Sequence, residues 1–228
     1  STWNKSARKN SRRNVKGDHG SNVVTTQQIA DTLKVGKNGE FNHSISCTKP
    51  VQYERADLLI DPYILGAWLG DGSASCARLA CGDEDIGHFI EQVREIIGIE
   101  PAVKRYKTAW EIRLSSGRGC DAKIQEKLRA LGVLNNKHLP VVYLMSSVEQ
   151  RLALLQGLMD TDGSCYKAAG NCEFTSTRKE LVIGVMELVQ SLGIKATINE
   201  AASVRIRMDA SAASTTSDWS RPSLRAIS

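Results

Sequence analysis

Apolar residues recur every three or four positions in several stretches of this chain, which is the spacing of an amphipathic helix. The clearest stripe runs from residue 86 to 97, and a similar one runs from 182 to 189. Shorter helices are expected at 25–33, with Thr25 or Thr26 as the N-cap, and at 121–131. Residues 34–56 show no such period and are expected to be irregular or to form short strands.

Residues 102–115 alternate instead, which predicts strands with one polar and one apolar face. The polar positions are Arg105, Lys107, Glu111 and Arg113, and the apolar positions are Tyr106, Trp110, Ile112 and Leu114. Because Lys104 and Arg118 add to the positive charge, the polar face can meet phosphates and base edges of a nucleic acid. A solvated sheet surface is the alternative interpretation.

Two nine-residue segments of the chain repeat each other. Residues 64–72 align with residues 155–163 at an offset of 91, and the helices that follow them align at an offset of 95. This pattern predicts an internal duplication in which each half contains a helix, a strand pair, a second helix and a further strand. The helix expected at 121–131 has no clear counterpart in the second half.

Both repeated segments are expected to be apolar helices that end in Asp-Gly. Gly66 and Gly70 in the first segment, and Gly157 and Thr161 in the second, are spaced four residues apart. Small residues at this spacing allow two helices to approach each other closely. The glycine that closes each segment is expected to end its helix in the left-handed conformation.

Asp71 and Asp162 occupy the last turn of these helices, where the helix dipole disfavours a carboxylate. If the two helices pack around a pseudo-two-fold axis, the carboxylates converge, and a divalent cation relieves their repulsion. Mg²⁺ suits such a site because it needs few carboxylates and keeps several waters. A carboxylate pair that holds metal at a symmetric centre is suited to the cleavage of two phosphodiester bonds. The alternative is that the helices only pack and that both acids are plain caps.

The 228 residues are 41% hydrophobic and 24% charged, and no apolar run is long enough to span a membrane. The polar, basic N-terminus has no secretory signal, so we expect a cytoplasmic protein without a membrane partner. The net charge of +5 comes from residues 1–20 and 201–228, so a nucleic-acid partner must be argued from local clusters. Six cysteines without a CxxC pair indicate reduced thiols rather than a zinc site.

The repeated segments resemble the paired motifs of the LAGLIDADG homing endonucleases. Their surroundings are most similar to the intein-encoded branch, particularly inteins of bacterial replicative DNA helicases. Further markers of the resemblance are Asp61-Pro62-Tyr63 ahead of the first motif and Lys137-His138-Leu139-Pro140 between the two motifs. The resemblance implies an α+β fold of two pseudo-two-fold αββαββα units, whose antiparallel sheets straddle the major groove of DNA.

The resemblance further implies a monomeric, site-specific double-strand DNA endonuclease that uses Mg²⁺, cuts a long asymmetric target and works at the bacterial nucleoid. Asp71 and Asp162 would be its catalytic, metal-binding acids, with Gly70 and Thr161 beside them at the metal, and Lys137 its catalytic lysine. Asp160, which stands where the first motif has Leu69, is not expected to be catalytic. The expected DNA contacts are Arg78, Lys104, Arg105, Lys107, Arg113 and Arg118 in the first half, and Tyr166, Lys167 and Arg178 in the second, to which Arg205 and Arg207 add.

Five segments are expected along the chain. They are a flexible basic arm at 1–22, a linker or splicing-domain remnant at 23–55, a first half at 56–150, a second half at 151–209 and a disordered tail at 210–228. The second half is short, so the final strands of its sheet are expected to be missing. A cleavage-deficient DNA- or RNA-binding module, such as a regulator or maturase, or a decayed intein remnant, is therefore the alternative to an active nuclease.

Overall fold

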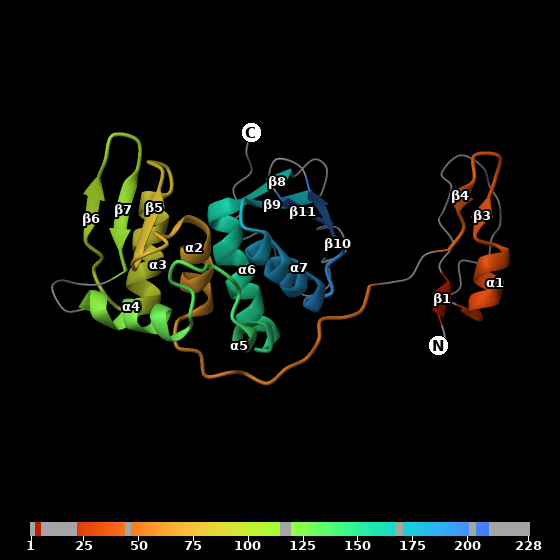
Figure 1. The fold of residues 1–228 in the computed structure, drawn as a ribbon, viewed down its shortest axis with the longest axis horizontal. Coiled ribbons are helices and arrows are strands. Elements are labelled where there is room, and N and C mark those ends of the chain that lie inside the picture. Colours follow the sequence, from red (N-terminus) through yellow and green to blue (C-terminus); the bar gives the residue numbers. More distant parts are fainter. Residues whose placement is uncertain are drawn as a thin grey trace. The chain divides into compact units, whose positions relative to one another are not determined.

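The computed structural model describes residues 3–5, 22–43, 47–114, 120–166, 171–200 and 204–209 (Figure 1). Contacts divide the chain into unit 1, Ser1–Thr48, and unit 2, Lys49–Ser228. Most of the predicted basic arm and all of the predicted tail at 210–228 lie outside the described residues. Within the described part of the chain, no helix is long and apolar enough to cross a membrane.

Unit 1 consists of short elements. Strand β1 (Trp3–Lys5) pairs with β2 (Asn22–Val24), and β3 (Lys34–Val35) pairs with β4 (Glu40–Phe41). Helix α1 (Thr26–Asp31) begins with a capping box, in which the Gln28 amide N–H donates to Thr25 Oγ1 and the Thr25 N–H donates to Gln28 Oε1. The predicted N-cap at Thr25 is confirmed.

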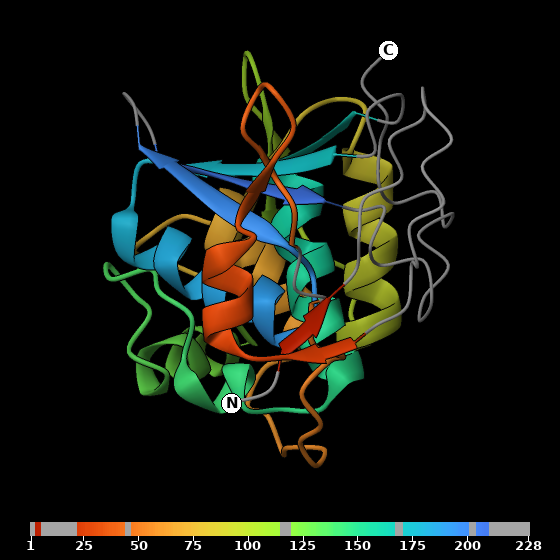
Figure 2. The ribbon, with the colours of Figure 1, turned by 90° about the vertical axis from the view of Figure 1, so that its right-hand side faces the viewer.

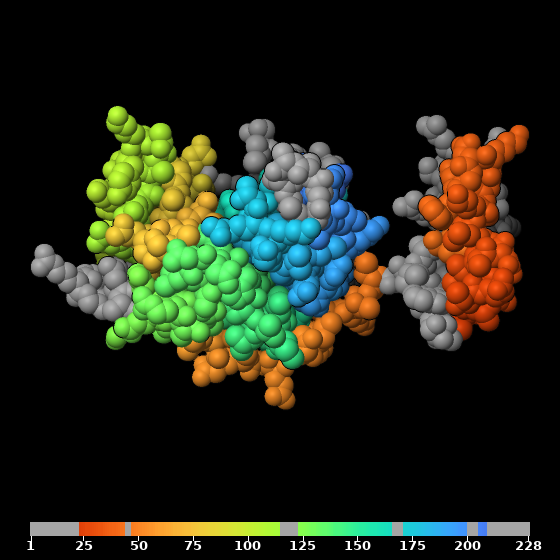
Figure 3. Space-filling model, in the orientation of Figure 1, coloured from red at the N-terminus to blue at the C-terminus, as the bar shows by residue number. Residues whose placement is uncertain are grey.

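Unit 2 contains two halves of related but not identical element order, which lie side by side in Figure 3. The first half comprises α2 (Pro62–Asp71), β5 (Arg78–Cys81), α3 (Ile86–Ile97), β6 (Val103–Arg105), β7 (Trp110–Arg113) and α4 (Cys120–Ala130). A short helix, α5 (Val141–Leu144), precedes the second half. That half comprises α6 (Val148–Asp162), β8 (Gly163–Tyr166), β9 (Asn171–Ser176), α7 (Lys179–Ser191), β10 (Ala196–Glu200) and β11 (Val204–Asp209).

The two antiparallel sheets differ in size. The first has the strand order β5-β7-β6, and Gly72 adds an isolated bridge to Leu79 where a further strand would lie. The second has four strands in the order β10-β11-β9-β8 and lies on the upper side of α6 and α7 in Figures 1 and 2. The expectation that the final strands of the second sheet are missing is therefore wrong, because β10 and β11 are both present.

Each sheet turns one face towards helices and leaves the other face open. Leu79 and Ile112 are buried on the helix-covered face of the first sheet, as are Phe174 and Ile206 in the second. Helices α2 and α6 pack against each other at the centre of the unit. Their buried residues, among them Leu65, Trp68, Leu155 and Leu158, join the two halves into one hydrophobic core. The α+β class and the antiparallel sheets are confirmed.

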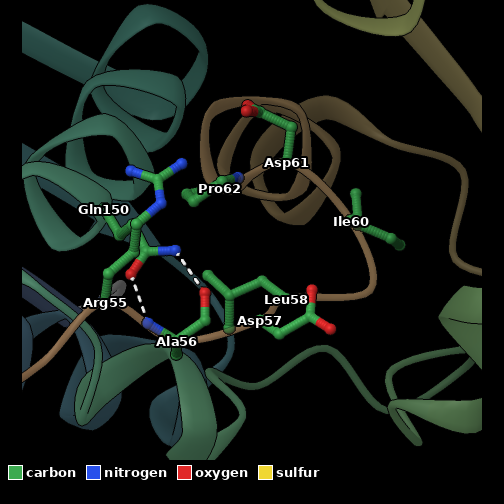
Figure 4. Close-up of a pocket in the computed structure, with 8 residues that line it drawn as sticks. All are labelled: Arg55, Ala56, Asp57, Leu58, Ile60, Asp61, Pro62 and Gln150. Atoms are coloured by element: carbon green, nitrogen blue, oxygen red, sulfur yellow. Dashed lines mark hydrogen bonds between the residues drawn. The ribbon is translucent and has the colours of Figure 1, made fainter.

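An extended segment, residues 49–60, runs along the helical side of unit 2. The side-chain amide of Gln150 pairs with both backbone groups of Ala56, as Figure 4 shows, and the hydroxyl of Tyr143 pairs with both backbone groups of Ile60. The fully buried Arg151 donates to the carbonyl oxygens of Val51 and Ser191. The segment is thus held as part of unit 2.

A cavity of about 370 Å³ lies beside this segment. It is lined by Arg55, Ala56, Asp57, Leu58, Ile60, Asp61, Pro62 and Gln150 (Figure 4). Asp61 and Pro62 stand at the N-terminus of α2, and Asp71 stands at its C-terminus, so the length of the helix separates the cavity from the predicted acids.

Candidate active site

The motif helices α2 and α6 touch through their small residues. A Cβ atom added at Gly66 would collide with the Leu154 carbonyl, and one added at Gly157 would lie 2.7 Å from the Ala67 nitrogen. At the end of the contact, a Cβ at Gly70 would lie 2.8 Å from Thr161 Cβ. Because real Cβ atoms do not approach backbone so closely, these glycines are required for the helices to meet.

Both motif helices end without a left-handed residue. Gly72 has φ −72° and ψ 149°, and Gly163 has φ −98° and ψ 157°. The left-handed cap predicted at each position is wrong, because strand pairing begins at once: Gly72 pairs with Leu79, and Gly163 is the first residue of β8. Glycine is needed for space instead, since a Cβ would collide with Trp68 at 72 and with Met159 at 163.

This packing brings the ends of both helices to one place, where Asp71, Asp162 and Lys137 gather. The carboxyl carbon of Asp162 lies 3.6 Å from the position of a Cβ on Gly70. Lys137 is only 7% exposed, and its Nζ donates a hydrogen bond of 2.7 Å to the Gly70 carbonyl. Nζ also lies 5.3 Å from the ring centre of Trp68. Lys137 is therefore a buried lysine whose charge is close to both acids.

The pKa values reflect burial of like and unlike charges together. Burial and, to a smaller extent, the charge of Asp71 raise the pKa of Asp162 to about 6, against the opposing effect of Lys137. Burial also raises the pKa of Asp71, against the opposing effect of Lys137. The pKa of Lys137 is lowered to about 8 by burial, although the carboxylate of Asp162 opposes that shift. Two partly desolvated carboxyls that repel each other favour a bound cation.

The donor set matches a hard divalent ion. In the described ranges no group of three or more His, Cys, Asp and Glu residues could hold a metal, which leaves the two carboxylates, backbone carbonyls and water as ligands. Oxygen ligands with retained water are typical of Mg²⁺, whereas zinc sites use histidine and cysteine. The Gly70 carbonyl already accepts from Lys137, and the Thr161 hydroxyl donates to the carbonyls of Gly157 and Leu158.

The open face of the first sheet carries three of the six basic residues predicted to contact DNA in the first half. Arg78 lies opposite Arg113, and Lys104 lies opposite Glu111, on the face away from Leu79 and Ile112. Arg78 also forms an ion pair of 3.2 Å with Glu111. Lys107 lies in the connection between β6 and β7, and Arg118 lies outside the described residues.

Arg105 does not share this face. It lies opposite Trp110, which lies opposite Cys81, so all three are on the helix-covered side of the sheet. The guanidinium of Arg105 and the indole N–H of Trp110 both donate to the carboxylate of Asp83. The predicted alternation is wrong here. It assumed one continuous strand, but the turn at 106–109 separates β6 from β7, so the faces of residues before the turn do not follow from those after it.

The open face of the second sheet is polar with balanced charge. Register places Thr197, Glu173, Arg205 and Arg207 on it, and Arg205 lies 3.4 Å from Glu173. Tyr166 pairs with Asn171 at the end of β8, and Lys167 lies outside the described residues. The threonines and asparagines of this face were not among the expected DNA contacts. Alternation along β10 would have found them.

Arg178 stands at the N-cap of α7, and its charge lowers the pKa of Lys137.

The cysteines differ from expectation in one place. Cys165 and Cys172 lie opposite each other on β8 and β9 and form a disulfide, so the prediction of reduced thiols is wrong for this pair. Cys47, Cys76 and Cys81 are free.

The family match falls in the second half of unit 2. Residues 149–209 match the LAGLIDADG-like domain family. Over 174 residues the chain is 37% identical to the replicative DNA helicase DnaB of Mycobacterium intracellulare, an alignment that covers 76% of this chain and 26% of the helicase. The chain thus spans about a quarter of the length of this relative. The resemblance inferred from the two motifs is confirmed.

Solved structures with a similar fold include mesophilic variants of the homing endonuclease I-DmoI, with a TM-score of 0.46 and 16% identity over 66% of this chain and 88% of that chain. I-DmoI in complex with DNA and Mn gives a TM-score of 0.45 at 16% identity, covering 66% and 89%. The N-terminal LAGLIDADG domain of DUF199/WhiA gives 0.39 at 13% identity, covering 65% and 76%.

Proposed function

We propose that this chain, whose residues 149–209 match the LAGLIDADG-like domain family, is a site-specific double-strand DNA endonuclease that depends on Mg²⁺. One observation carries the proposal: Asp71 and Asp162 reach the same place from two packed helices, with Lys137 between them. A structural pair of acids would gain nothing from burial beside each other, since their repulsion opposes folding. A pair that binds a divalent ion gains from it.

Each residue of this group has a distinct part. The carboxylates of Asp71 and Asp162 would hold the ion, with backbone oxygens of the helix ends and water completing its shell. When bound, the ion supplies Lewis-acid stabilisation of the phosphate charge that develops during hydrolysis. Lys137 Nζ, fixed on the Gly70 carbonyl, holds a proton and places positive charge beside the attacked phosphate.

The open sheet faces would bind the DNA. On the first sheet, Arg78, Lys104 and Arg113 offer positive charge to phosphates and guanine edges. On the second, Arg205, Arg207 and Thr197 offer hydrogen bonds with little net charge. Because the two faces differ in chemistry, the two halves of the target would differ in sequence. The target is accordingly a long, asymmetric duplex bound by one copy of the chain.

A cleavage-deficient DNA-binding protein is the second candidate, and the ion pairs on the sheets favour it. Arg78 and Arg205 are both paired with glutamates, which reduces the charge available to DNA. A regulator needs the sheets but has no use for a buried acid pair. The acid pair therefore separates the two candidates.

The test is selection from a degenerate duplex library. Purified protein is incubated with the library and Mg²⁺, and the cut ends are captured and sequenced. We expect ends that share one long two-part site, and no ends from Asp71→Asn or Asp162→Asn. Bound sequence without cutting, in Ca²⁺ or Mg²⁺, would establish the binding protein instead.

A further inference from the structure

Helix α6 carries a third acid, Asp160, whose side chain is 3% exposed. Its Oδ2 accepts a hydrogen bond of 2.9 Å from the hydroxyl of Tyr63 on α2. The same hydroxyl lies 2.9 Å from Nε2 of His88 on α3. Since the single hydroxyl proton goes to Asp160, Nε2 of His88 is the donor to the hydroxyl oxygen. Three helices are joined by this one chain of hydrogen bonds, hereafter the Asp160 triad.

The Asp160 triad joins the helices at a cost in folding free energy, because it buries polar groups. The second oxygen of Asp160, Oδ1, is buried and finds no hydrogen-bond partner among the residues that the structure describes. Burial, and then the charge of Asp160, raises the pKa of Tyr63. Well-packed apolar side chains of similar size usually stabilise a core at least as well as a buried charged group. Packing alone therefore does not account for Asp160.

The internal repeat shows what an apolar solution looks like. At the offsets of 91 and 95 residues, the counterparts of Asp160, Tyr63 and His88 are Leu69, Leu154 and Ile183. Leu69 is 1% exposed and Leu154 is 0% exposed, whereas Ile183 is 44% exposed. The fold accommodates buried hydrocarbon at the positions equivalent to Asp160 and Tyr63, so the polar pair belongs to one half only.

The two motif helices are also secured differently at the ends that carry the catalytic acids. At α2, the Gly72 N–H donates to the Trp68 carbonyl at 2.9 Å, and Lys137 donates to the Gly70 carbonyl. At α6, the Thr161 hydroxyl donates to the carbonyls of Gly157 and Leu158, and Gly163 pairs with Phe174 in the sheet as Gly72 pairs with Leu79. Last helical turns fray because their carbonyls lack partners within the helix. Asp160, in the turn that carries Asp162, is tied to α2 and α3 instead.

We propose that Asp160 is a positioning residue, which with Tyr63 and His88 fixes the last turn of α6 so that the Asp162 carboxylate faces Asp71. The triad does for α6 what Lys137 and the Gly72 N–H do for α2. It acts through Asp162 and does not itself touch DNA or metal. The proposal rests on the endonuclease function inferred above.

The decisive variant is Asp160→Leu, which installs the residue of the first half. We expect its free energy of unfolding to equal or exceed that of the wild type and its DNA affinity in Ca²⁺ to be unchanged. Its single-turnover cleavage rate in Mg²⁺ at saturating DNA should fall at least about tenfold, because small displacements of reacting groups are costly. Asp160→Asn keeps an acceptor for Tyr63 and should restore most of the rate.

A folded Asp160→Leu protein that cuts at the wild-type rate would overturn the proposal. So would a variant whose loss of rate follows its loss of stability, since that marks a plain structural contact. Ca²⁺ binding to the DNA-free protein, measured by calorimetry, gives a second readout: Asp162→Asn should abolish it and Asp160→Leu should weaken it about tenfold. If the wild type does not cut DNA, the endonuclease function fails, and equal Ca²⁺ affinities of wild type and Asp160→Leu would still overturn the positioning role.

Discussion

Lys137 Nζ lies 2.7 Å from the carbonyl oxygen of Gly70, the residue directly before Asp71. The lysine comes from the segment that joins the two halves, and it is buried against Trp68 of the same helix. One side chain thus fixes the end of α2 and places a positive charge between two carboxylates whose charges both act on it. This arrangement decides what each of the three groups contributes.

Replacing Lys137 by methionine should remove the charge with little loss of packing. Single-turnover cleavage at saturating DNA is expected to fall about 10²- to 10³-fold, because a buried cation next to the phosphate acts mainly in the transition state. DNA affinity should change little. Lys127→Met, on the exposed face of α4, is the matched control and should cut normally. Normal cutting by Lys137→Met would exclude a catalytic lysine.

The raised pKa of Asp162 predicts how stability depends on pH in the absence of metal. Its pKa rises from 3.8 to about 6 on folding, so the folded state binds the proton more tightly. The stability that this group contributes is present below pH 3.8 and is lost as pH rises through 6. Chemical denaturation in EDTA should therefore show that the free energy of unfolding of Asp162→Asn increases relative to that of the wild type between pH 4 and pH 7. Parallel profiles for the two proteins would contradict the burial of this carboxyl.

The contact between the motif helices leaves no room for a methyl group. Gly66→Ala should destabilise unit 2 by about 1–3 kcal/mol or more, because the added Cβ meets the backbone of α6. Gly87→Ala is the control, since it lies in helix α3 with nothing within 4 Å of the added atom. That substitution should stabilise by about 0.5–1 kcal/mol through helix propensity. Equal effects in thermal unfolding would rule out the close contact.

Features that repeat along the sequence could be predicted, and for this reason the packing at the centre of the molecule was predicted correctly. The apolar faces, the small residues at four-residue spacing and the paired Asp-Gly ends are all local patterns, and duplication required them to meet. Arg105 could not be placed, because its face depends on the turn at 106–109 rather than on spacing. The extended ends at Gly72 and Gly163 depend on the strands that follow.

Contacts that depend on distant partners left no trace in local pattern. Arg151 binds groups 40 and 100 residues away in sequence, and a basic residue in a motif helix would ordinarily be placed on the surface. Asp160 meets Tyr63 across 97 residues. Asp160 stands where the repeat has Leu69, and this difference, which was used only as an argument against a catalytic role, was the available signal for the contact.

The buried Arg151 should be essential for holding segment 49–60. Arg151→Met leaves the carbonyls of Val51 and Ser146 without their donor and the carbonyl of Ser191 with the Val51 N–H alone, which we expect to cost about 2–4 kcal/mol of stability. The released segment should be cut faster by trypsin after Arg55, as followed by mass spectrometry. Arg129→Met, an exposed arginine of α4, should leave the rate unchanged. An unchanged cutting rate in Arg151→Met would show that the other contacts suffice.

The register of the first sheet places two arginines, both expected to contact DNA, on opposite faces of the sheet. Arg113 lies on the open face, whereas Arg105 lies on the covered face with its guanidinium on Asp83. Arg113→Ala should weaken binding of the selected duplex and reduce the slope of log K against log salt by about one, as for a lost phosphate contact. Arg105→Ala should leave that slope unchanged and lower the stability slightly, by less than about 1 kcal/mol, since the ion pair is exposed. Fluorescence anisotropy over a salt series measures both, and a larger effect from Arg105 would mean that DNA meets the edge of the sheet rather than its open face.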